Sequence, residues 1–512
     1  MINISGSNYI AGKKSKKGKE KFTSINPKTN KKGKINFYNA TKEEIDKAVN
    51  EAEICFSEVS NYSDKKIASF LKTLSKEIIN LGNQLIDVCD KETALGENRL
   101  INERTRTCNQ LEMFAEFVLD GSYLEAIADN KKEGQPDIRR MLLPLGTVAV
   151  FPASNFPFAF GVCGGDTASA FAAKCPVIVK AHPLHPETSE LFSKAVYKSI
   201  EKNNFPKGFF SLVHGNKKKV GEQIVLNSKI KAVGFTGSAS AGRALFDLAS
   251  KRKVPIPVYA EMGSVNPIFI TKKAMEKRNT ELASEISASI TLGSGQFCTK
   301  PGLIFLIDNS FSNIFIEKLS HLMKEKDPGI LISNRIKKGL EKTVKVSNKI
   351  DGAELSFGGK PIKNKTSFQN TLFITDSKTF LKEKQIQKEH FGPAAFIVKC
   401  KNLDEFLKIS EHLEGQLTAT IDLERKDYKQ IKPLLHMLKR KAGRLIINGV
   451  PTGVRVCNAM QHGGPYPATT YSNTTSVGMQ AIKRFLRPVC FQDFPDELLP
   501  NELKRKKDSK NY

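Results

Sequence analysis

Short apolar runs alternate with amphipathic segments along the middle of the chain, from residue 146 onward. The runs lie at 148–151, 177–181, 209–213, 232–235 and 257–261, and helical spacing of apolar residues separates them at 164–174, 188–201, 220–227 and 240–249. Parallel strands that are buried on both faces read as near-continuous apolar runs, and helices connect them. The pattern predicts an α/β fold with a doubly wound parallel sheet.

A second α/β pattern follows from residue 266. Strand-like runs lie at 267–270, 303–307, 394–399, 417–421 and 444–448, and helical spacing occupies 281–292, 311–324 and 403–412. Residues 335–365 are rich in lysine and in turn-forming residues, so we expect a basic surface segment there. The sequence therefore predicts two successive α/β units.

The two ends of the chain lack the alternation of strands and helices that marks its centre. Short strands and lysine-rich turns are expected up to residue 39, and Thr41 and Glu44 then have the spacing of a capping box that starts a helix. Helices are expected near 63–80 and onward to about residue 128. Near the C-terminus, residues 466–494 alternate apolar and polar positions, which favours an extended arm lying on a partner subunit.

Composition narrows the class of protein. The chain has 512 residues, enough for two or more domains, and a formal net charge of +27. Such a charge raises the alternative of a nucleic-acid partner, but the lysines are dispersed and no aromatic residues interleave with them as stacking platforms. We therefore expect no nucleic-acid partner and interpret the charge as lysine enrichment that leaves room for an anionic substrate or cofactor.

Cysteine usage and hydropathy bear on the compartment. The nine cysteines are scattered and form no C-x-x-C pair, so neither a zinc site nor a disulfide framework is indicated. The N-terminus lacks the basic start and apolar core of a signal peptide, and no run of about 20 apolar residues indicates a membrane span. We expect a cytoplasmic protein with no membrane partner.

Polar residues gather where the strands of the first unit end. Asn155 follows the first strand, Lys180 ends the second, Gly237 and Ser238 follow the fourth, and Glu261 ends the fifth. Doubly wound sheets bind their ligands at this edge. The loop from Gly237 lacks both the dinucleotide fingerprint and the Walker sequence, yet a helix N-terminus there can still hold a phosphate through its free amides.

A cysteine stands in a glycine-containing stretch of the second unit. Cys298 follows the sequence Gly-Ser-Gly-Gln-Phe, in which the glycines let the main chain approach a ligand closely. A small buried thiol on a turn is the alternative reading of any single cysteine.

Six motifs taken together resemble one family. Phe-Pro-Ala-Ser-Asn155, Val-Lys180-Ala-His-Pro, Gly-Phe-Thr-Gly237-Ser, Ala-Glu261-Met-Gly-Ser, Gly-Gln-Phe-Cys298-Thr and Glu389-His-Phe-Gly-Pro occur in this order, and their order and spacing resemble the aldehyde dehydrogenase superfamily over essentially the whole chain. Further stretches, including His-Gly-Gly-Pro-Tyr-Pro-Ala-Thr-Thr, resemble the branch that holds 2-oxoglutarate semialdehyde (2,5-dioxopentanoate) dehydrogenases and an NADP-dependent fatty-aldehyde dehydrogenase.

The resemblance implies three catalytic roles. Cys298 would attack the aldehyde carbon as a thiolate. Asn155 would donate its side-chain amide to the developing oxyanion, beside the backbone N–H of Cys298. Glu261 would then activate the water that releases the acid from the thioester. Asn155 as a turn residue and Glu261 as a solvated strand end are the alternatives, and the joint placement of both residues at strand ends disfavours them.

The resemblance also implies a cofactor site. Lys180 would bind the adenosine ribose, Gly237 and Ser238 the pyrophosphate, and Glu389 the nicotinamide ribose, with Phe391 beside the ring. Relatives that prefer NAD usually have a glutamate where this chain has Pro183, and Lys218 lies in a run of three lysines where this branch often places an arginine on the 2′-phosphate. We therefore expect NADP, with NAD as the alternative; a solvated loop is the alternative interpretation of the lysine run.

Candidate substrate residues surround this chemistry. Phe156, Phe160 and Phe297 are expected to line the aldehyde tunnel, with ordinary core packing as the alternative. A dicarbonyl acid also needs a cation for its carboxylate, for which Arg106 is the choice beside the other candidates Arg104 and Arg455. His182 and His185 invite a metal site, but no third ligand follows them in the sequence, so no metal is expected.

The predicted organisation follows the aldehyde dehydrogenase fold. A Rossmann-like cofactor-binding domain would comprise residues 1–128 and 146–265, an α/β catalytic domain 266–462, an oligomerisation element 129–145 and 463–495, and a basic tail 496–512. The expected protein is a homodimer or homotetramer that oxidises 2,5-dioxopentanoate to 2-oxoglutarate. A long-chain aliphatic aldehyde is the near alternative, and a non-catalytic nucleic-acid-binding protein is the remote one.

Overall fold

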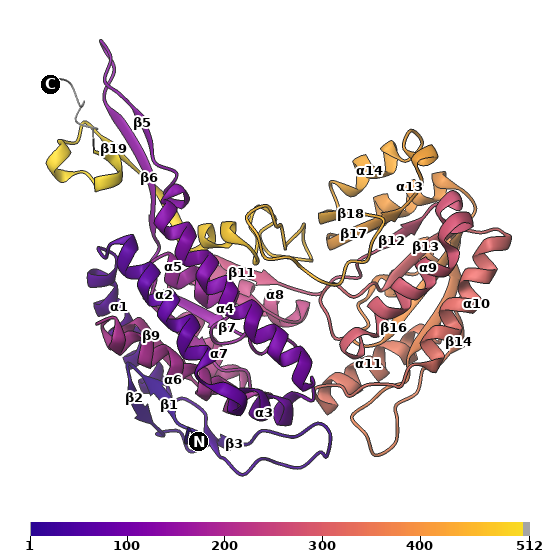
Figure 1. Cartoon of the computed structure of the whole chain (residues 1–512), viewed down its shortest axis with the longest axis horizontal. Coiled ribbons are helices and arrows are strands. Elements are labelled where there is room, and N and C mark those ends of the chain that lie inside the picture. The colour runs from indigo at the N-terminus through magenta and orange to yellow at the C-terminus, as the bar shows by residue number, and fades with distance from the viewer. Residues whose placement is uncertain (1, 505–512) are drawn as a thin grey trace.

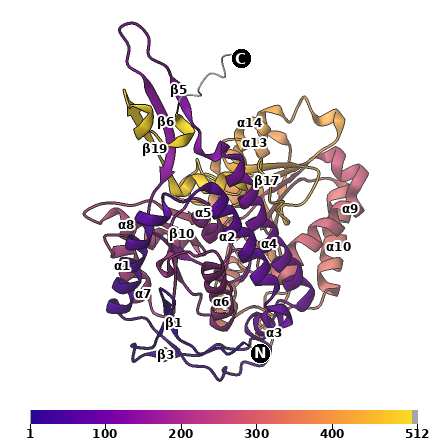
Figure 2. The same cartoon turned by 60° about the vertical axis from the view of Figure 1, so that its left-hand side comes forward.

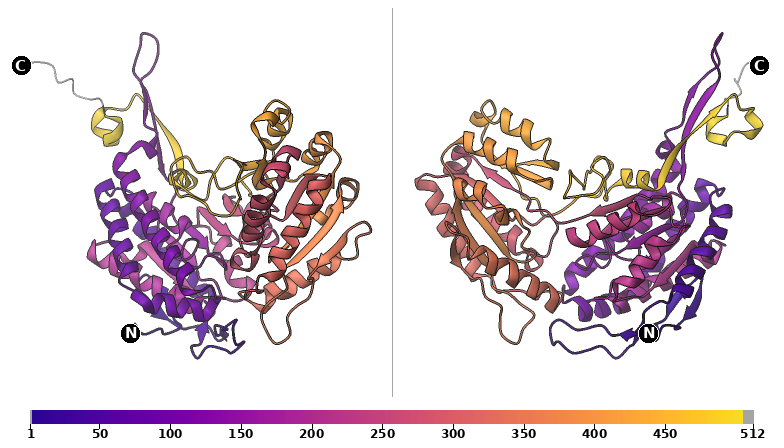
Figure 3. Two further views of the ribbon diagram at one scale, coloured as in Figure 1. Left: turned by 45° about the vertical axis from the view of Figure 1, so that its right-hand side comes forward. Right: turned by 180° about the vertical axis from the view of Figure 1, so that it is seen from behind.

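The computed structural model describes residues 2–504 and consists of two α/β lobes with a third, small sheet that projects from them (Figure 1). Helices flank each large sheet, and the C-terminal segment crosses from the second lobe back to the first (Figures 1 and 3). Of the predicted basic tail, residues 505–512 lie outside the described part.

The first large sheet has seven strands in the order β11-β10-β7-β8-β9-β1-β2. The parallel strands are β7 (Val148–Phe151), β8 (Val177–Lys180), β9 (Phe210–Val213), β10 (Ala232–Thr236) and β11 (Val258–Glu261). The strands β1 (Asn8–Ile10) and β2 (Lys13–Ser15) add an antiparallel edge. The predicted doubly wound sheet is present, because each apolar run forms a strand and each amphipathic segment forms the helix that follows it.

Alternate residues of the central strand β7 explain why its sequence is apolar throughout. Val148 and Val150 pack into one core with helices of the first face, and Ala149 and Phe151 pack into another core with helices of the second face. The helices of this lobe are α1 (Lys42–Val59), α2 (Asp64–Ile79), α3 (Gly82–Thr93), α4 (Glu97–Asp120), α5 (Gly165–Ala172), α6 (Pro186–Lys202), α7 (Lys218–Leu226) and α8 (Ala239–Ser250). Both faces are buried, so neither set of side chains is polar.

The second large sheet repeats this arrangement in the order β14-β15-β16-β13-β12-β17-β18. Its strands are β12 (Ile268–Ile270), β13 (Leu303–Ile307), β14 (Glu354–Phe357), β15 (Thr371–Asp376), β16 (Ala394–Cys400), β17 (Gln416–Asp422) and β18 (Ala442–Ile447); its helices are α9 (Lys272–Thr291), α10 (Ser310–Glu325), α11 (Asn334–Ser347), α12 (Ser377–Lys382), α13 (Leu403–His412) and α14 (Lys432–Leu438). All neighbouring strands run parallel except β14, which lies antiparallel at the edge.

Local structure differs from expectation at three places, although the segment 335–365 lies at the surface as expected. The basic segment 335–365 is largely the helix α11 and the strand β14, because Leu340 and Val344 lie one turn apart and are buried between the lysines. The strand β15 was missed. In the first lobe, the helical region that was expected to reach about residue 128 ends earlier. The helix α4 stops at Asp120, where Gly121 adopts a left-handed conformation, and the strand β5 follows.

A three-stranded antiparallel sheet joins the two ends of the chain outside the lobes. β5 (Ile127–Asp129) and β19 (Leu486–Gln492) flank β6 (Ile138–Pro144), so residues about 350 positions apart lie side by side (Figure 2). The hairpin of β5 and β6 projects away from both lobes in Figures 1 and 2. The domain bounds and the oligomeric role of this sheet stay predictions. The remaining strands, β3 (Lys21–Phe22) and β4 (Phe37–Tyr38), form a short hairpin-like pair.

Candidate active site

The carboxyl ends of neighbouring parallel strands bring the predicted residues of the first lobe to one edge. Glu261 ends β11, Gly237 and Ser238 follow β10, Asn155 follows β7, and Lys180 ends β8, in the order in which these strands pair. The spacing of a parallel sheet fixes this arrangement, because the side chains that leave adjacent strands emerge next to each other.

Cys298 reaches this edge from the second lobe. The helix α9 ends at Thr291, and Gly293, Ser294 and Gly295 then all have positive φ, which turns the chain sharply toward the first lobe. A Cβ atom on Gly295 would lie 2.2 Å from the carbonyl oxygen of Gly392, so only glycine fits there. The glycines before the cysteine therefore position the backbone.

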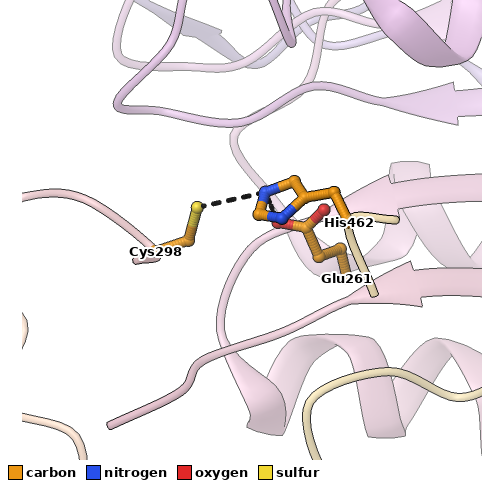
Figure 4. Close-up of side chains that lie close together, drawn as sticks. All are labelled: Glu261, Cys298 and His462. Carbon is orange, nitrogen blue, oxygen red and sulfur yellow. Dashed lines mark hydrogen bonds and ion pairs between the residues drawn. The ribbon is translucent and has the colours of Figure 1, made fainter. Parts of the chain in front are cut away.

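Cys298, His462 and Glu261 form a contiguous group of side chains (Figure 4). The Sγ atom of Cys298 lies 3.6 Å from Nε2 of His462, and the same Nε2 lies 3.3 Å from Oε1 of Glu261. The histidine and the glutamate are 1% and 3% exposed, whereas Cys298 is half-buried. The imidazole can thus take the thiol proton while Glu261 stabilises the imidazolium, which is how a paired base activates a cysteine.

The sequence did not identify His462 as a functional residue, because it lies in a segment without periodic structure. Residues 462–476 lie along β11: Met262 donates its backbone N–H to Ala468, and the Ser476 hydroxyl donates to Oε2 of Glu261. More than 200 positions separate Glu261 from its partners His462 and Ser476. In the sequence, His462 stood out only as part of the stretch that resembles one branch of the family. That resemblance gave His462 no catalytic role.

The surroundings of His462 shift the pKa values of Glu261 and Cys298 in opposite directions. Burial alone would raise the pKa of Glu261, but His462, Ser476 and Arg484 more than offset burial and hold that pKa below its usual value. Burial, followed by the charges of Glu261 and Glu389, raises the pKa of the Cys298 thiol well above its usual value. Glu261 is therefore a carboxylate near neutral pH, and the thiol needs a proton acceptor in order to react.

Asn155 lies where its amide can serve the same centre. Its Nδ2 donates one hydrogen bond of 2.8 Å to the carbonyl oxygen of Gln296, two residues before Cys298. The second N–H of the amide is left for another acceptor. The backbone oxygen of Asn155 accepts from Arg99 at 2.5 Å, which fixes the loop after β7 against α4.

The three predicted tunnel phenylalanines form one aromatic wall. The ring of Phe156 meets the rings of Phe160 and Phe297 edge to face, at 5.5 and 5.1 Å, and Phe160 continues to His462 at 6.3 Å. Val454, Val456 and Met460 pack with Phe156 and Phe160 from the C-terminal segment. The wall is therefore apolar and ends beside the reactive group.

Two guanidinium groups lie on this aromatic wall. Arg106 lies 5.4 Å from the Phe160 ring, and Arg99 lies 4.9 and 4.8 Å from Phe156 and Phe297. Burial lowers the pKa of Arg106, while Glu103, Cys298 and Glu261 partly offset burial. Nε of Arg106 and Nη1 of Arg99 are buried without a hydrogen-bond partner among residues 2–504. Each guanidinium therefore has a free donor that can bind an anionic ligand.

The other candidate arginines have different surroundings. Arg104 donates to the backbone of Gly82 at 3.1 Å, and Arg455 is exposed on the loop that follows β18. Arg444, which the sequence did not single out, is half-buried on β18; burial lowers its pKa and Cys298 partly offsets this. Of the three predicted arginines, the structure brings Arg106 to the aromatic wall.

The predicted cofactor residues of the first lobe fit a phosphate-bearing ligand. Ser238 caps α8, and its neighbours Gly237, Ala239 and Ser240 are exposed, so the free amides of this helix start are accessible. Lys180 has no acidic partner among residues 2–504, and burial lowers its pKa to about 8. Lys218 is exposed at the start of α7. These groups supply donors and positive charge without a competing carboxylate.

The two cofactor residues of the second lobe lie in the segment that leads into β16. The carboxylate of Glu389 lies so close to Gly263 that a Cβ atom there would be 2.1 Å from it, and Phe391 is half-buried two residues later. Lys300, which was missed, is 2% exposed and donates to the backbone of Ala394 at 2.5 Å. Burial raises the pKa of Glu389 and lowers that of Lys300. The opposite charge of each residue partly offsets the effect of burial on the pKa of the other.

His182 and His185 form no metal site of three ligands in the described part of the chain. Their rings stack at 5.1 Å; Nε2 of His185 contacts the backbone oxygen of Ala153, and Nδ1 of His182 accepts from Leu184. All nine cysteines are unpaired. No helix within residues 2–504 has the length and apolar character that crossing a bilayer requires.

Comparison with known proteins decides the family. The chain matches the aldehyde dehydrogenase family over residues 13–483. The chain belongs to the aldehyde dehydrogenase family. The resemblance seen in the six sequence motifs is thereby confirmed, and so is the predicted enzyme class.

This aldehyde dehydrogenase has curated relatives with a named substrate. It is 44% identical over 441 residues to "Alpha-ketoglutaric semialdehyde dehydrogenase 2" of Azospirillum brasilense, covering 85% of this chain and 84% of that one. It is 38% identical over 510 residues to "Alpha-ketoglutaric semialdehyde dehydrogenase" of Acinetobacter baylyi, covering 98% and 97%. The solved lactaldehyde dehydrogenase from Escherichia coli superposes with a TM-score of 0.82 at 21% identity, covering 96% and 99%, which confirms the predicted fold.

A substitution at Asn155 of this aldehyde dehydrogenase tests the proposed oxyanion donor. We expect Asn155→Ala to lower kcat by about 10²–10³-fold, which corresponds to about 3–4 kcal/mol of lost transition-state stabilisation, with a small change in KM. Steady-state kinetics with any accepted aldehyde gives both constants. A rise in KM at unchanged kcat would instead assign Asn155 to ground-state binding.

Proposed function

We propose that this aldehyde dehydrogenase oxidises 2,5-dioxopentanoate to 2-oxoglutarate with NADP. The observation that carries the substrate is the guanidinium of Arg106, which lies on the Phe160 ring beside Cys298 with a buried Nε that has no partner among residues 2–504. An aliphatic aldehyde offers nothing to such a group, whereas a carboxylate satisfies it. The names of the two curated relatives support the same substrate.

The roles of the protein groups follow from their positions. The thiol of Cys298 gives its proton to His462, and the sulfur forms a bond with the aldehyde carbon. Asn155 and the backbone N–H of Cys298 donate to the oxygen that becomes negative. A nicotinamide held by Glu389 and Phe391 would supply the hydride acceptor, and loss of hydride from that carbon would leave a thioester on Cys298. Glu261 then takes a proton from the water that hydrolyses the thioester, and the acid leaves.

Charge around the wall supports a substrate with one carboxylate. Arg99 and Arg106 lie one turn before and after Glu103 on α4, so one acidic group lies between two guanidiniums. Glu103 already accepts from the backbone N–H groups of Phe158 and Ala159 at 2.8 and 2.9 Å. The surplus positive charge is therefore available to a ligand in the tunnel. The phenylalanines hold the carbon chain, and the wall directs its other end toward Cys298.

Comparison of two aldehydes of equal chain length tests this function. With the wild-type protein and NADP, we expect kcat/KM for 2,5-dioxopentanoate to exceed that for pentanal by at least about 10²-fold, because a buried charged hydrogen bond is worth about 1.5–3 kcal/mol and the 2-oxo group adds contacts. Equal or higher kcat/KM for pentanal, or for a longer aliphatic aldehyde, would favour the fatty-aldehyde alternative.

Removal of the Arg106 charge tests the carboxylate site separately. We expect Arg106→Leu to lower kcat/KM for 2,5-dioxopentanoate by about 10–100-fold and to leave that for pentanal within about threefold. Arg104→Leu is the matched control, because Arg104 lies two residues away on the same helix and contacts Gly82 instead. Equal losses for both aldehydes in Arg106→Leu would show that the residue acts on folding or on the wall alone.

The cofactor preference rests on two positions. Pro183 leaves no carboxylate to repel a 2′-phosphate, and Lys218 offers a cation at the exposed start of α7. We expect Lys218→Ala to raise KM for NADP by about 5–10-fold, as expected for about 1 kcal/mol from one exposed charge contact, and to leave KM for NAD unchanged. Lys251→Ala, at the exposed C-terminal end of α8, is the control. An equal change for both cofactors would contradict the assignment.

The third sheet is proposed as the contact between subunits of a homodimer or homotetramer in the cytoplasm. All three residues of β5 are exposed, including Ile127 at 51%, and the outer edge of this strand has no neighbour within residues 2–504. Nine unpaired cysteines fit a reducing compartment. Sedimentation of the wild-type protein and of Ile127→Lys compares the oligomers; identical masses would place the contact elsewhere.

A further inference from the structure

We propose that Cys298, His462 and Glu261 together form a binding site for one thiophilic divalent cation, Zn²⁺ being the best fit, and that its binding masks the nucleophile reversibly. The three side chains contribute one sulfur, one nitrogen and one oxygen, all within 4.8 Å of one another (Figure 4). The inference rests on this geometry and is independent of which aldehyde the enzyme oxidises.

Two of the three separations match those that a tetrahedral zinc ion imposes. With bonds of about 2.3 Å to sulfur and about 2.0 Å to nitrogen or oxygen, tetrahedral zinc holds S and N about 3.5 Å apart and N and O about 3.3 Å apart. In the structure, Sγ of Cys298 lies 3.6 Å from Nε2 of His462, and this Nε2 lies 3.3 Å from Oε1 of Glu261. The third pair, Sγ of Cys298 and Oε1 of Glu261, lies within 4.8 Å, so the three atoms can close on one ion through side-chain movement.

The donor set selects the metal. A thiolate, an imidazole and a carboxylate suit Zn²⁺ and, through the sulfur, Cd²⁺, whereas Mg²⁺ and Ca²⁺ require more oxygen ligands than this group supplies. Three protein ligands leave the fourth position of zinc for water. On binding, the thiol proton leaves to solvent and the sulfur lone pair enters the metal bond. The thiolate and the carboxylate then balance the charge of the ion, and the sulfur can no longer attack an aldehyde.

The surroundings predict a reversible site and not a permanent one. The Ser476 hydroxyl holds Oε2 of Glu261, which leaves Oε1 for the metal. Nδ1 of His462, however, is buried without a partner among residues 2–504. Histidine ligands usually donate this second N–H to a carboxylate or carbonyl, and its loss typically weakens a metal site by about 10–100-fold. Half-buried Cys298 keeps the group accessible from solvent.

Zinc binding is measured on the full-length protein without aldehyde or cofactor, so its outcome does not depend on the proposed substrate. We expect calorimetric titration with Zn²⁺ to give one strong site per chain, and saturating Zn²⁺ to slow the alkylation of Cys298 by iodoacetamide at least about tenfold. Mg²⁺ should give no protection. Aldehyde oxidation should stop at the same zinc concentrations and recover when a chelator is added.

Ligand variants decide whether the three residues form the site. His462→Asn and Glu261→Gln should each weaken zinc binding at least about tenfold, and each should reduce the zinc protection of Cys298, measured as the ratio of alkylation rates with and without zinc. His321→Asn is the matched control, because His321 and Glu325 form an exposed pair at 3.2 Å with the same ligand types. Wild-type zinc affinity in His462→Asn, or undiminished alkylation of Cys298 at saturating Zn²⁺, would overturn the proposal.

Discussion

Replacement of Cys298 by alanine is expected to lower kcat by about 10⁴-fold or more with every aldehyde. Within residues 2–504, no other cysteine lies in the group with His462 and Glu261, so no second thiol there can take over the attack. The side chain is half-buried and small, so the free energy of unfolding should change little. Steady-state rates of NADPH formation and a thermal melt, measured on the same sample, separate loss of chemistry from loss of fold.

Cys490→Ala is the control for this variant. Cys490 is an exposed, unpaired cysteine on β19, far from the strand ends that carry the site, and its replacement should leave kcat unchanged. Substantial aldehyde oxidation by Cys298→Ala would contradict a mechanism through a cysteine thioester, whatever the substrate.

Replacement of Glu261 by glutamine has the second-largest expected effect, and its signature is different. Glutamine keeps the shape and the contact with Ser476 but cannot take a proton from water. The first turnover should still form NADPH, and thioester hydrolysis should slow by about 10²–10⁴-fold. Rapid mixing should therefore show a burst close to one NADPH per active site, followed by a slow steady rate.

Two comparisons make the burst interpretable. Glu222→Gln changes an exposed glutamate on α7 and should turn over like the wild type. If Glu261→Gln lost the burst along with the steady rate, Glu261 would act before the thioester forms, for example by stabilising protonated His462 across their contact of 3.3 Å. The size of the burst thus distinguishes a base for water from a partner of the imidazole.

Local patterns predicted the large sheets well because each signal is contained in a few residues. The run from Val148 to Phe151 forms β7 with the predicted bounds, since a strand buried on both faces requires apolar residues at every position. The helix in segment 335–365 was not predicted, because few of its residues are apolar. Its two buried apolar residues, Leu340 and Val344, form one narrow stripe, and composition alone does not reveal a helix among the surrounding lysines.

Nonlocal contacts explain what the sequence could not predict at the site. Asn155, Lys180 and Glu261 could be placed at one edge because strand order alone brings strand ends together. His462 and Ser476 reach Glu261 from a coil more than 200 residues later, and Lys300 is buried two residues after the nucleophile where no periodicity marks it. Arg99 was passed over because its position on α4 becomes informative only when the aromatic wall is known.

The measurement that tests the account most directly is the mass of the acyl group on Cys298. The wild-type protein, mixed with NADP and 2,5-dioxopentanoate and quenched in acid during turnover, should give a peptide containing Cys298 that carries a 2-oxoglutaryl thioester. Such an adduct identifies the nucleophile and the substrate together. Absence of the adduct during rapid NADPH formation, or its presence on Cys457 instead of Cys298, would contradict the account.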